Sequence, residues 1–192
     1  MRILLVHQYF LPKEGSGGSR FNEMTKVWAS MGHEITVLSG MVYHNSGQKY
    51  PKYKGKYFVR EKYSKGVEVI RCHDREGGQN NYFSRFLVYI TFMFSSVFAG
   101  LFYCNRRYDI VLVSSPPIFV GISGVILSIL KRANLIFEVR DLWPESAVDT
   151  GVLRNKLLIR SALACEKYLY KKAKLINVLT PAFAQTLKTV KG

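Results

Sequence analysis

Cysteine is scarce in this 192-residue sequence, with no C-x-x-C pair and no nearby histidine in a zinc-ligand pattern. The cysteines are Cys72, Cys104 and Cys165. Their spacing disfavours a disulfide framework and a structural zinc site, and fits a protein of a reducing compartment. The apolar run at the N-terminus ends at His7 and is too short for the core of a signal peptide, so we expect a cytoplasmic protein.

Several catalytic and nucleotide-binding signatures are also missing. The histidines fall in no H-E-x-x-H pattern, and the sequence has no G-x-S-x-G elbow. The first glycine-rich loop matches neither the dinucleotide fingerprint G-x-G-x-x-G nor a Walker A motif with its lysine. These absences lower the expectation of NAD or ATP as a ligand.

Acidic residues are few: 13 Asp and Glu stand against 28 Lys and Arg, for a net charge of +15. Residues 47–66 hold seven basic residues against one acid, and residues 151–192 hold nine against one. Such an excess suggests a polyanionic partner, which can be a nucleic acid, an anionic membrane face or a phosphorylated ligand. Nucleic acid is the least favoured of these, because most aromatic residues lie in one apolar segment rather than among the basic ones.

Apolar runs of strand type alternate with helical patterns along the whole chain. Strands are predicted at 2–6, 34–38, 57–63, 67–72, 110–113, 135–139 and 175–178, and helices at 19–31, 82–104, 118–131, 155–172 and after Pro181. This alternation predicts an α/β fold with a Rossmann-like, doubly wound, mostly parallel sheet. Residues 1–192 are expected to form a single domain. The turn at 64–66 predicts a small β-hairpin insertion whose second strand can also join the main sheet.

Residues 86–104 contain no charged side chain, and this uncharged segment is long enough for a transmembrane helix. A crossing would place the preceding and following strands on opposite sides of a bilayer, so the helix is expected to stay on one side. Two interpretations remain open: a fully buried helix, or a helix whose outer face dips into a lipid interface. The candidates for that outer face are Phe92, Phe94, Phe98 and Phe102.

Three segments are expected at the carboxyl edge of the sheet, where ligands bind in such folds. The first is EGSGGSR at 14–20, where glycines and a helix N-terminus suit a phosphate. Its candidate ligands are Gly15, Gly17, Gly18, Ser19 and Arg20. The alternative is a loop in which Ser19 only caps the helix.

The other two segments follow later strands. Ser114 and Ser115 can hydrogen-bond a sugar or phosphate, or can serve only to form the turn before two prolines. In FEVRDLWPES at 137–146, Arg140 can hold a phosphate and Asp141 can accept a hydroxyl proton or a hydrogen bond. Trp143 offers a face for stacking a sugar. The alternative is a structural Arg140–Asp141 pair with a helix opened by the following proline.

The motifs HQYFLP, WASMGHEITVLSG, YDIVLVSSPPIFVG and FEVRDLWPES occur in an order that resembles the N-terminal domain of family 4 glycosyltransferases. The likeness is closest to fucosaminyl-type transferases of bacterial O-antigen and capsule synthesis. It implies the N-terminal half of a GT-B fold, with the C-terminal donor-binding domain absent from this chain. It further implies an acceptor-side domain that is inactive alone, in an enzyme that transfers a sugar from a nucleoside-diphosphate donor with retention.

The resemblance also implies roles for residues. Gly17 and Gly18 match the loop beside the donor diphosphate, and Arg140 and Asp141 match the catalytic position, where many relatives carry His-Asp. The implied acceptor-binding residues are Ser114, Ser115, Glu138, Trp143 and Glu145. No metal or other cofactor is expected. The expected partners are a nucleotide-sugar donor, a glycan or lipid-linked acceptor and an anionic membrane, at the inner face of the bacterial cytoplasmic membrane.

Two other hypotheses remain open from the sequence. One is a self-contained nucleotide-binding Rossmann protein, against which stands the missing dinucleotide fingerprint. The other is a basic module that binds a membrane or a nucleic acid. The sequence leaves the oligomeric state undetermined.

Overall fold

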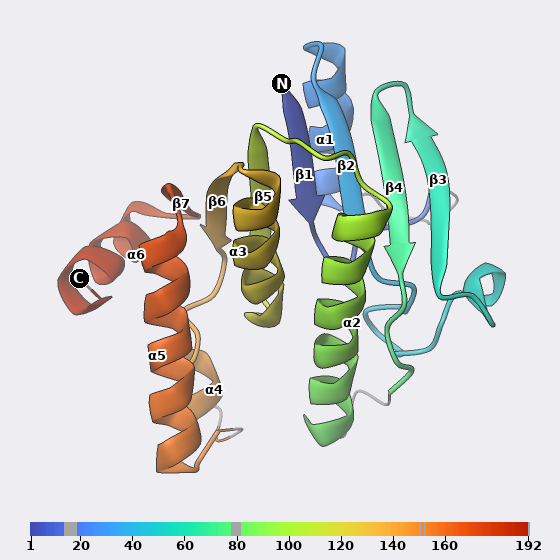
Figure 1. Ribbon diagram of the computed structural model, residues 1–192. Helices are drawn as coiled ribbons and strands as arrows, with labels where there is room; N and C mark the ends of the chain where they lie inside the picture. The colour runs from blue at the N-terminus through green and yellow to red at the C-terminus, as the bar shows by residue number, and fades with distance from the viewer. Residues whose placement is uncertain (14–18, 78–81, 150, 152, 192) are drawn as a thin grey trace.

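The computed structural model describes residues 1–13, 19–77, 82–149, 151 and 153–191, in which a seven-stranded sheet carries helices on both faces (Figure 1). The strand order is β3-β4-β2-β1-β5-β6-β7. The strands are β1 Arg2–Val6, β2 Glu34–Ser39, β3 Phe58–Ser64, β4 Val67–Cys72, β5 Ile110–Ser115, β6 Asn134–Val139 and β7 Leu175–Val178. All neighbouring strands pair in parallel except β3 with β4. The predicted α/β class with a doubly wound, mostly parallel sheet is confirmed.

The predicted hairpin forms, and it belongs to the main sheet. Gly66, with a φ of +78°, makes the turn between β3 and β4 in a conformation that favours glycine. β4 pairs in parallel with β2, with Val37 opposite Val69, so β3 becomes the antiparallel edge strand. The second run of the hairpin therefore extends the Rossmann-like sheet.

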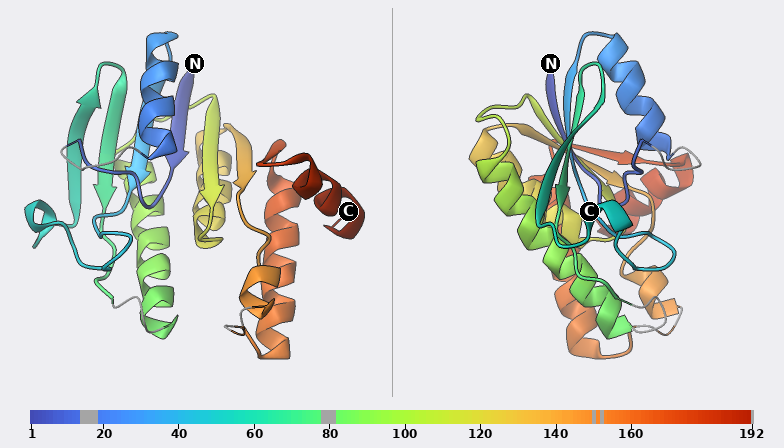
Figure 2. Two further views of the ribbon diagram at one scale, coloured as in Figure 1. Left: turned by 180° about the vertical axis from the view of Figure 1, so that it is seen from behind. Right: turned by 90° about the vertical axis from the view of Figure 1, so that its right-hand side faces the viewer.

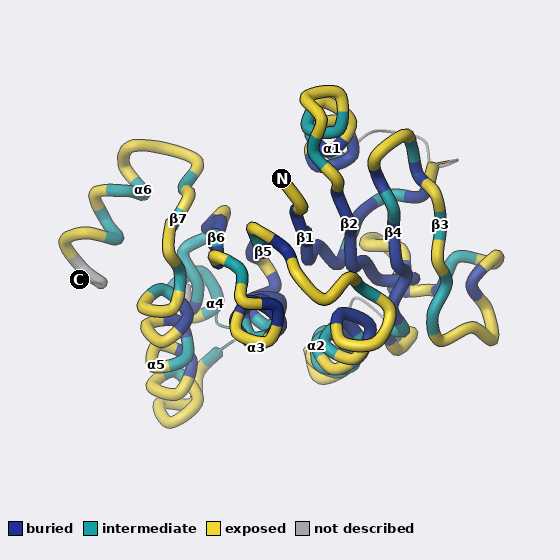
Figure 3. The backbone as a smooth tube through the Cα atoms, turned by 45° about the horizontal axis from the view of Figure 1, so that its top comes forward, coloured by how far each residue is buried: buried dark blue, intermediate teal, exposed yellow. Residues whose placement is uncertain are grey.

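The helices form two layers (Figures 2 and 3). They are α1 Arg20–Ser30, α2 Tyr82–Phe102, α3 Phe119–Lys131, α4 Glu145–Asp149, α5 Lys156–Lys172 and α6 Pro181–Thr186, with a 3₁₀ turn at Pro51–Tyr53 and a π turn at Leu187–Lys191. Helices α2, α3 and α5 cover one face of the sheet, and α1 and α6 lie on the other. Ser19 caps α1 by accepting from the Asn22 backbone N–H, and Asn155 caps α5 in the same way.

Alternating side chains of the strands feed two hydrophobic cores. In β1, Leu4 and Val6 point to the core beneath α2, α3 and α5, whereas Ile3 and Leu5 point to the core beneath α1. This is the period-two pattern of a strand buried on both faces. Small residues let the helices approach closely: a Cβ at Gly124 of α3 would lie 2.3 Å from Cγ1 of Val113 in β5.

Helix α2 is long and apolar enough to cross a membrane by length and composition, and 28% of its most apolar window is buried. The strands that precede and follow it, β4 and β5, lie in one sheet, so in this fold α2 packs on that sheet instead of crossing a bilayer. Phe92 was an expected candidate for the outer face, but it is only 1% exposed and belongs to the core. Phe94, Phe98 and Phe102 are exposed as expected, at 66%, 46% and 69%.

Candidate functional site

A groove of about 1790 Å³ lies at the carboxyl edge of the sheet. The lower ends of α2 and of α5 extend beyond this edge in Figure 1 and flank the loops that follow the strands. The groove is lined by residues that include His7 after β1, Pro116 after β5 and Arg140 after β6. These loops meet where the parallel order reverses between β1 and β5, the position at which open α/β sheets bind ligands.

The expected phosphate loop is described only in part. Gly15, Gly17 and Gly18 lie outside the described residues. Ser19 lines the groove and also caps α1, so its capping role is observed and its ligand role stays a prediction. Arg20 turns its guanidinium to Glu138 of β6, forming an ion pair between the start of α1 and the end of the sheet.

Glu138 lies at the centre of a buried hydrogen-bond network. Its side chain is 3% exposed, and its carboxylate is bound by Arg20, by Oγ of Ser114 at 2.7 Å and by Nδ2 of Asn177 at 3.0 Å. Ser115 donates to the Glu138 carbonyl at 3.4 Å. These contacts join α1, β5, β6 and β7 through one carboxylate. Three expected acceptor ligands, Ser114, Ser115 and Glu138, thus lie together but bind one another beneath the groove, and their role toward an acceptor stays a prediction.

His7 is a groove residue that the motif analysis missed. Its side chain is largely buried, and the pKa of the imidazole is lowered to about 3 by burial, then by Arg140 and by Arg20. Burial and the charges of Arg140 and Arg20 therefore keep this ring neutral. Its place directly after β1 is the one feature of the sequence that could have marked His7 as a groove residue. A single histidine outside any motif does not indicate a ligand site.

Arg140 and Asp141 both line the groove but do not pair with each other among the described residues. Asp141 instead accepts a hydrogen bond from Oγ of Ser146 at 2.9 Å. The Arg140 guanidinium is exposed and forms no ion pair with any described carboxylate. The structural Arg140–Asp141 pair considered from the sequence is therefore not formed, and the cation faces the groove.

The remaining expected site residues divide between two locations. Trp143 is half-buried and lines the groove beside Asp141, where its ring can reach a ligand. Glu145 opens α4 and does not line the groove. Its charge, after burial and Glu166, contributes to the raised pKa of the Tyr170 hydroxyl. A role for Glu145 in binding an acceptor stays a prediction, and this placement does not favour it.

Tyrosines form the wall of the groove opposite α5. The rings of Tyr43 and Tyr50 contact each other at a tilt of 34° with centroids 3.6 Å apart, and Tyr9 meets His44 edge to face at 4.6 Å. Burial is the largest cause of a strongly raised pKa of Tyr9, and the neighbouring Tyr89 raises it further. Residues 39–56 follow no helical or strand period in the sequence, so the sequence alone does not show that Tyr43 and Tyr50 line the groove.

Buried polar contacts hold this wall in place. Arg71 at the end of β4 is fully buried, donates to Oε2 of Glu61 at 2.9 Å and lies against the ring of Tyr53. The Tyr53 hydroxyl donates to the same carboxylate at 2.6 Å. Burial alone would raise the pKa of Glu61, but Tyr53, Arg71 and Lys52 lower it overall. The ionised carboxylate thus ties the 3₁₀ turn to β3 and β4.

Within the part of the chain that the structure describes, no group of His, Cys, Asp or Glu is arranged to hold a metal ion. The groove supplies cations, hydroxyls and aromatic faces, which suit phosphates and sugars.

Comparison with protein families gives one match: the model described as a glycosyl transferase 4-like domain covers residues 15–192. The chain belongs to this family. Among curated proteins, no match was found. The match supports a glycosyltransferase over the other two hypotheses, and the seven-stranded fold is consistent with the N-terminal half of a GT-B enzyme. The likeness to fucosaminyl-type transferases is not part of this match.

Proposed function

We propose that this glycosyl transferase 4-like domain is the acceptor-binding half of a retaining glycosyltransferase that uses a nucleoside-diphosphate sugar. A separate donor-binding domain would complete the active site, and the chain alone is expected to be inactive. The observation that carries the proposal is the exposed Arg140, which lines the groove together with His7 and forms no ion pair with a described carboxylate. The His7 imidazole is neutral, so the positive charge at this position comes from arginine. A guanidinium binds phosphate oxygens through charge-assisted hydrogen bonds, so this position suits a diphosphate.

The proposed reaction divides among the residues at this position. Arg140 and Arg20 stabilise the diphosphate as it leaves the anomeric carbon with the bonding electron pair, without a metal. The acceptor hydroxyl oxygen forms the new bond to that carbon on the same face, and its proton passes to the oxygen of the departing diphosphate that held the anomeric carbon. Asp141, oriented by Ser146 at 2.9 Å, can accept a hydrogen bond from that hydroxyl. Gly17 and Gly18 are proposed to contact the diphosphate from the α1 side.

The diphosphate position can be tested by NMR titration of the chain with UDP or pyrophosphate. Amide shifts are expected around His7, Arg20 and Arg140, and Arg140→Gln should weaken binding roughly tenfold because one charged donor is lost. Arg132→Gln, which removes an exposed cation after α3, is the matched control and should change nothing. Shifts confined to other parts of the sheet, or undiminished binding by Arg140→Gln, would contradict the assignment.

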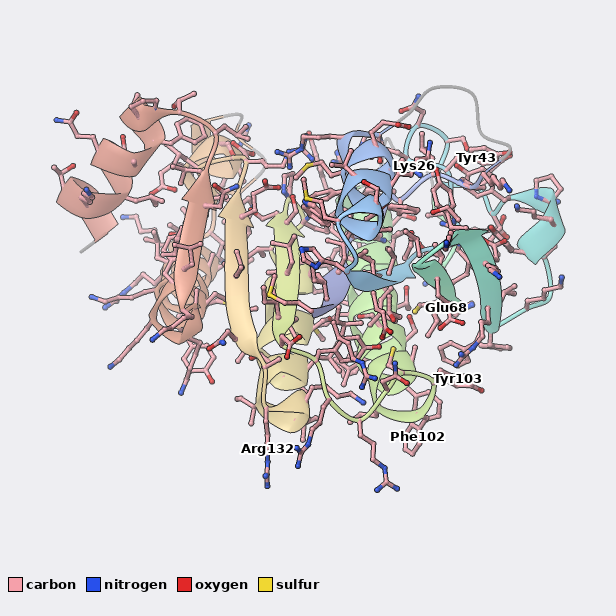
Figure 4. All side chains as sticks on the ribbon, turned by 90° about the horizontal axis from the view of Figure 1, so that it is seen from above. Lys26, Tyr43, Glu68, Phe102, Tyr103 and Arg132 are labelled. Carbon is pink, nitrogen blue, oxygen red and sulfur yellow. The ribbon has the colours of Figure 1, made fainter. Side chains whose placement is uncertain are left out.

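The proposed acceptor is a lipid-linked glycan at the inner face of the bacterial cytoplasmic membrane, in O-antigen or capsule synthesis. A fucosaminyl-type donor sugar is the candidate that the sequence motifs suggest, and nucleic acid is not proposed as a partner. Support for the membrane comes from the exposed apolar face of α2 and from the cations beside its C-terminal end. In Figure 4, Phe102 and Arg132 project from the same side of the molecule. The exposed cations there are Arg106, Arg107 and Arg132.

Sedimentation with vesicles tests this docking. The chain is expected to bind vesicles containing an anionic lipid more than neutral ones, and high salt should weaken the binding. A triple Asp variant of the α2 face should lose it: Phe94→Asp, Phe98→Asp and Phe102→Asp. A control variant places three Asp residues at other exposed apolar positions: Val27→Asp, Tyr57→Asp and Leu157→Asp. Equal losses in both variants, or no binding by the native chain, would refute docking through α2.

A further inference from the structure

A second cationic position exists in the groove, at Arg85 near the start of α2. Arg85 lines the groove, and its guanidinium donates to the Tyr89 hydroxyl at 3.4 Å. The first turn of α2 contains no acidic residue. A cation at a helix N-terminus lies close to the positive end of the helix dipole, which disfavours it. An anionic ligand would reverse that repulsion.

The surroundings of Arg85 contain hydroxyls rather than carboxylates. Its pKa is raised chiefly by the hydrogen bond with Tyr89, and the other groups that raise it are the tyrosines Tyr9 and Tyr82. Within the described part of the chain, no Asp or Glu forms an ion pair with this guanidinium. Tyrosine hydroxyls can donate to a phosphate while the guanidinium supplies its charge.

This position is separate from the one around His7. The charges that act on His7 are Arg140 and Arg20, from the sides of β6 and α1. Arg85 instead lowers the pKa of Tyr9, which follows His7 in the loop after β1. Figure 1 shows the start of α2 and the segment after β6 apart from each other, on either side of α3. One groove therefore presents cations at two positions.

Exposed aromatic side chains surround Arg85. Tyr82, Phe83 and Phe86 are 60%, 68% and 44% exposed, all within four residues of one another on α2. Phe86 also meets Phe119 of α3 edge to face, at 5.5 Å between centroids. A ligand held by Arg85 would thus have an apolar surface beside its anionic group, a combination found in an amphiphile rather than in a free sugar or an inorganic ion.

We propose that Arg85, with the Tyr9 and Tyr89 hydroxyls, binds the phosphate group of an amphiphilic acceptor, whose apolar part lies along Tyr82, Phe83 and Phe86. The inference rests on the proposed function in taking this groove as the acceptor site. It assigns the His7 position to the donor diphosphate and the Arg85 position to a phosphate that the acceptor itself carries.

Geranyl phosphate, below its aggregation concentration, is the probe, with geraniol and inorganic phosphate as comparisons, measured by calorimetry or NMR on the folded chain. Geranyl phosphate should bind more tightly than either comparison, because it offers both the anion and the apolar part. Arg85→Gln should weaken geranyl phosphate at least about tenfold and leave geraniol unchanged. Arg85→Lys should keep most of the affinity, which separates charge from folding. Lys65→Gln, an exposed cation in the turn between β3 and β4, is the matched control.

Three results would overturn the inference. The Arg85→Gln variant could bind geranyl phosphate as well as the native chain does, or the native chain could bind geraniol or inorganic phosphate as tightly as geranyl phosphate. The third result is that Arg85→Gln weakens only the binding of anionic vesicles. The last would mean that Arg85 contacts bilayer headgroups instead of an acceptor in the groove. UDP binding separates this inference from the proposed function, because Arg85→Gln should leave it unchanged while Arg140→Gln weakens it. Failure of geranyl phosphate alone refutes the Arg85 site, and failure of UDP refutes the diphosphate position.

Discussion

Replacing Glu138 with Ala should destabilise the domain through its network rather than through lost apolar contact. The substitution leaves Oγ of Ser114, which is 1% exposed, without its 2.7 Å acceptor, and leaves Nδ2 of Asn177 without its 3.0 Å acceptor. An unsatisfied buried hydroxyl costs about 1–3 kcal/mol. The ion pair with Arg20 adds little, because that side chain is 43% exposed and solvent screens it.

The lost hydrogen bonds destabilise the variant, whereas removal of the buried carboxylate removes a desolvation cost. The expected net loss in the free energy of unfolding is about 2–4 kcal/mol. Urea unfolding followed by circular dichroism measures it. For a domain of this size, the melting temperature should fall by about 5–15 °C.

A double-mutant cycle with Ser114→Ala tests the reasoning more sharply. Ser114→Ala alone should cost about 1 kcal/mol, but in the Glu138→Ala background it should cost almost nothing, because it removes the unsatisfied hydroxyl. The expected coupling is about 1–2 kcal/mol. Strict additivity of the two substitutions, or a Glu138→Ala variant as stable as the native chain, would refute the network as described.

Three further outcomes are expected from urea unfolding. The pKa of His7 in the folded chain is about 3, below its ordinary value near 6.5, so His7 binds fewer protons in the folded chain between these values and contributes a rise of native stability with pH across that window. The raised pKa of the buried Asp74, about 6, contributes in the opposite direction. His7→Gln should remove that rise, and an unchanged slope would contradict a buried neutral imidazole. Phe92→Ala, at a fully buried position, should lower the free energy of unfolding by about 3–5 kcal/mol. Phe94→Ala should change it by no more than about 0.5 kcal/mol. Similar losses in the two variants would refute the orientation of α2. Gly124→Ala should cost about 1–3 kcal/mol, because the added Cβ would lie 2.3 Å from Val113, and a neutral result would mean that α3 shifts easily.

Much of the fold could be predicted because its determinants are local in sequence. Ser19 and Asn155 precede apolar periodic segments and cap the helices that follow, as a polar residue before such a segment predicts. The apolar runs at 2–6 and 110–113 gave the neighbouring parallel strands β1 and β5. Boundaries were less certain: β5 continues through Ser115, because its pairing with β6 persists to Val139. That pairing partner is remote in sequence.

The face that α2 turns to the sheet was not predictable in full. Its residues are apolar almost all round, so hydrophobicity along the sequence did not separate Phe92 from Phe94. Packing separates them, because Phe92 joins the core while Phe94 is 66% exposed. Of the four candidates for the outer face, Phe94, Phe98 and Phe102 are exposed, whereas Phe92 is buried.

The candidate site shows the same division. The sequence by itself determined which residues follow the strands of the parallel sheet, and hence that Arg140, Asp141 and Trp143 gather at its carboxyl edge. Only the tertiary structure decided that Glu138 binds Arg20, Ser114 and Asn177, and that the His7 ring is buried within reach of the charges of Arg140 and Arg20. Strand periodicity fixes the position of a residue along an edge, whereas its partners come from distant segments that meet only when the sheet and its helices pack.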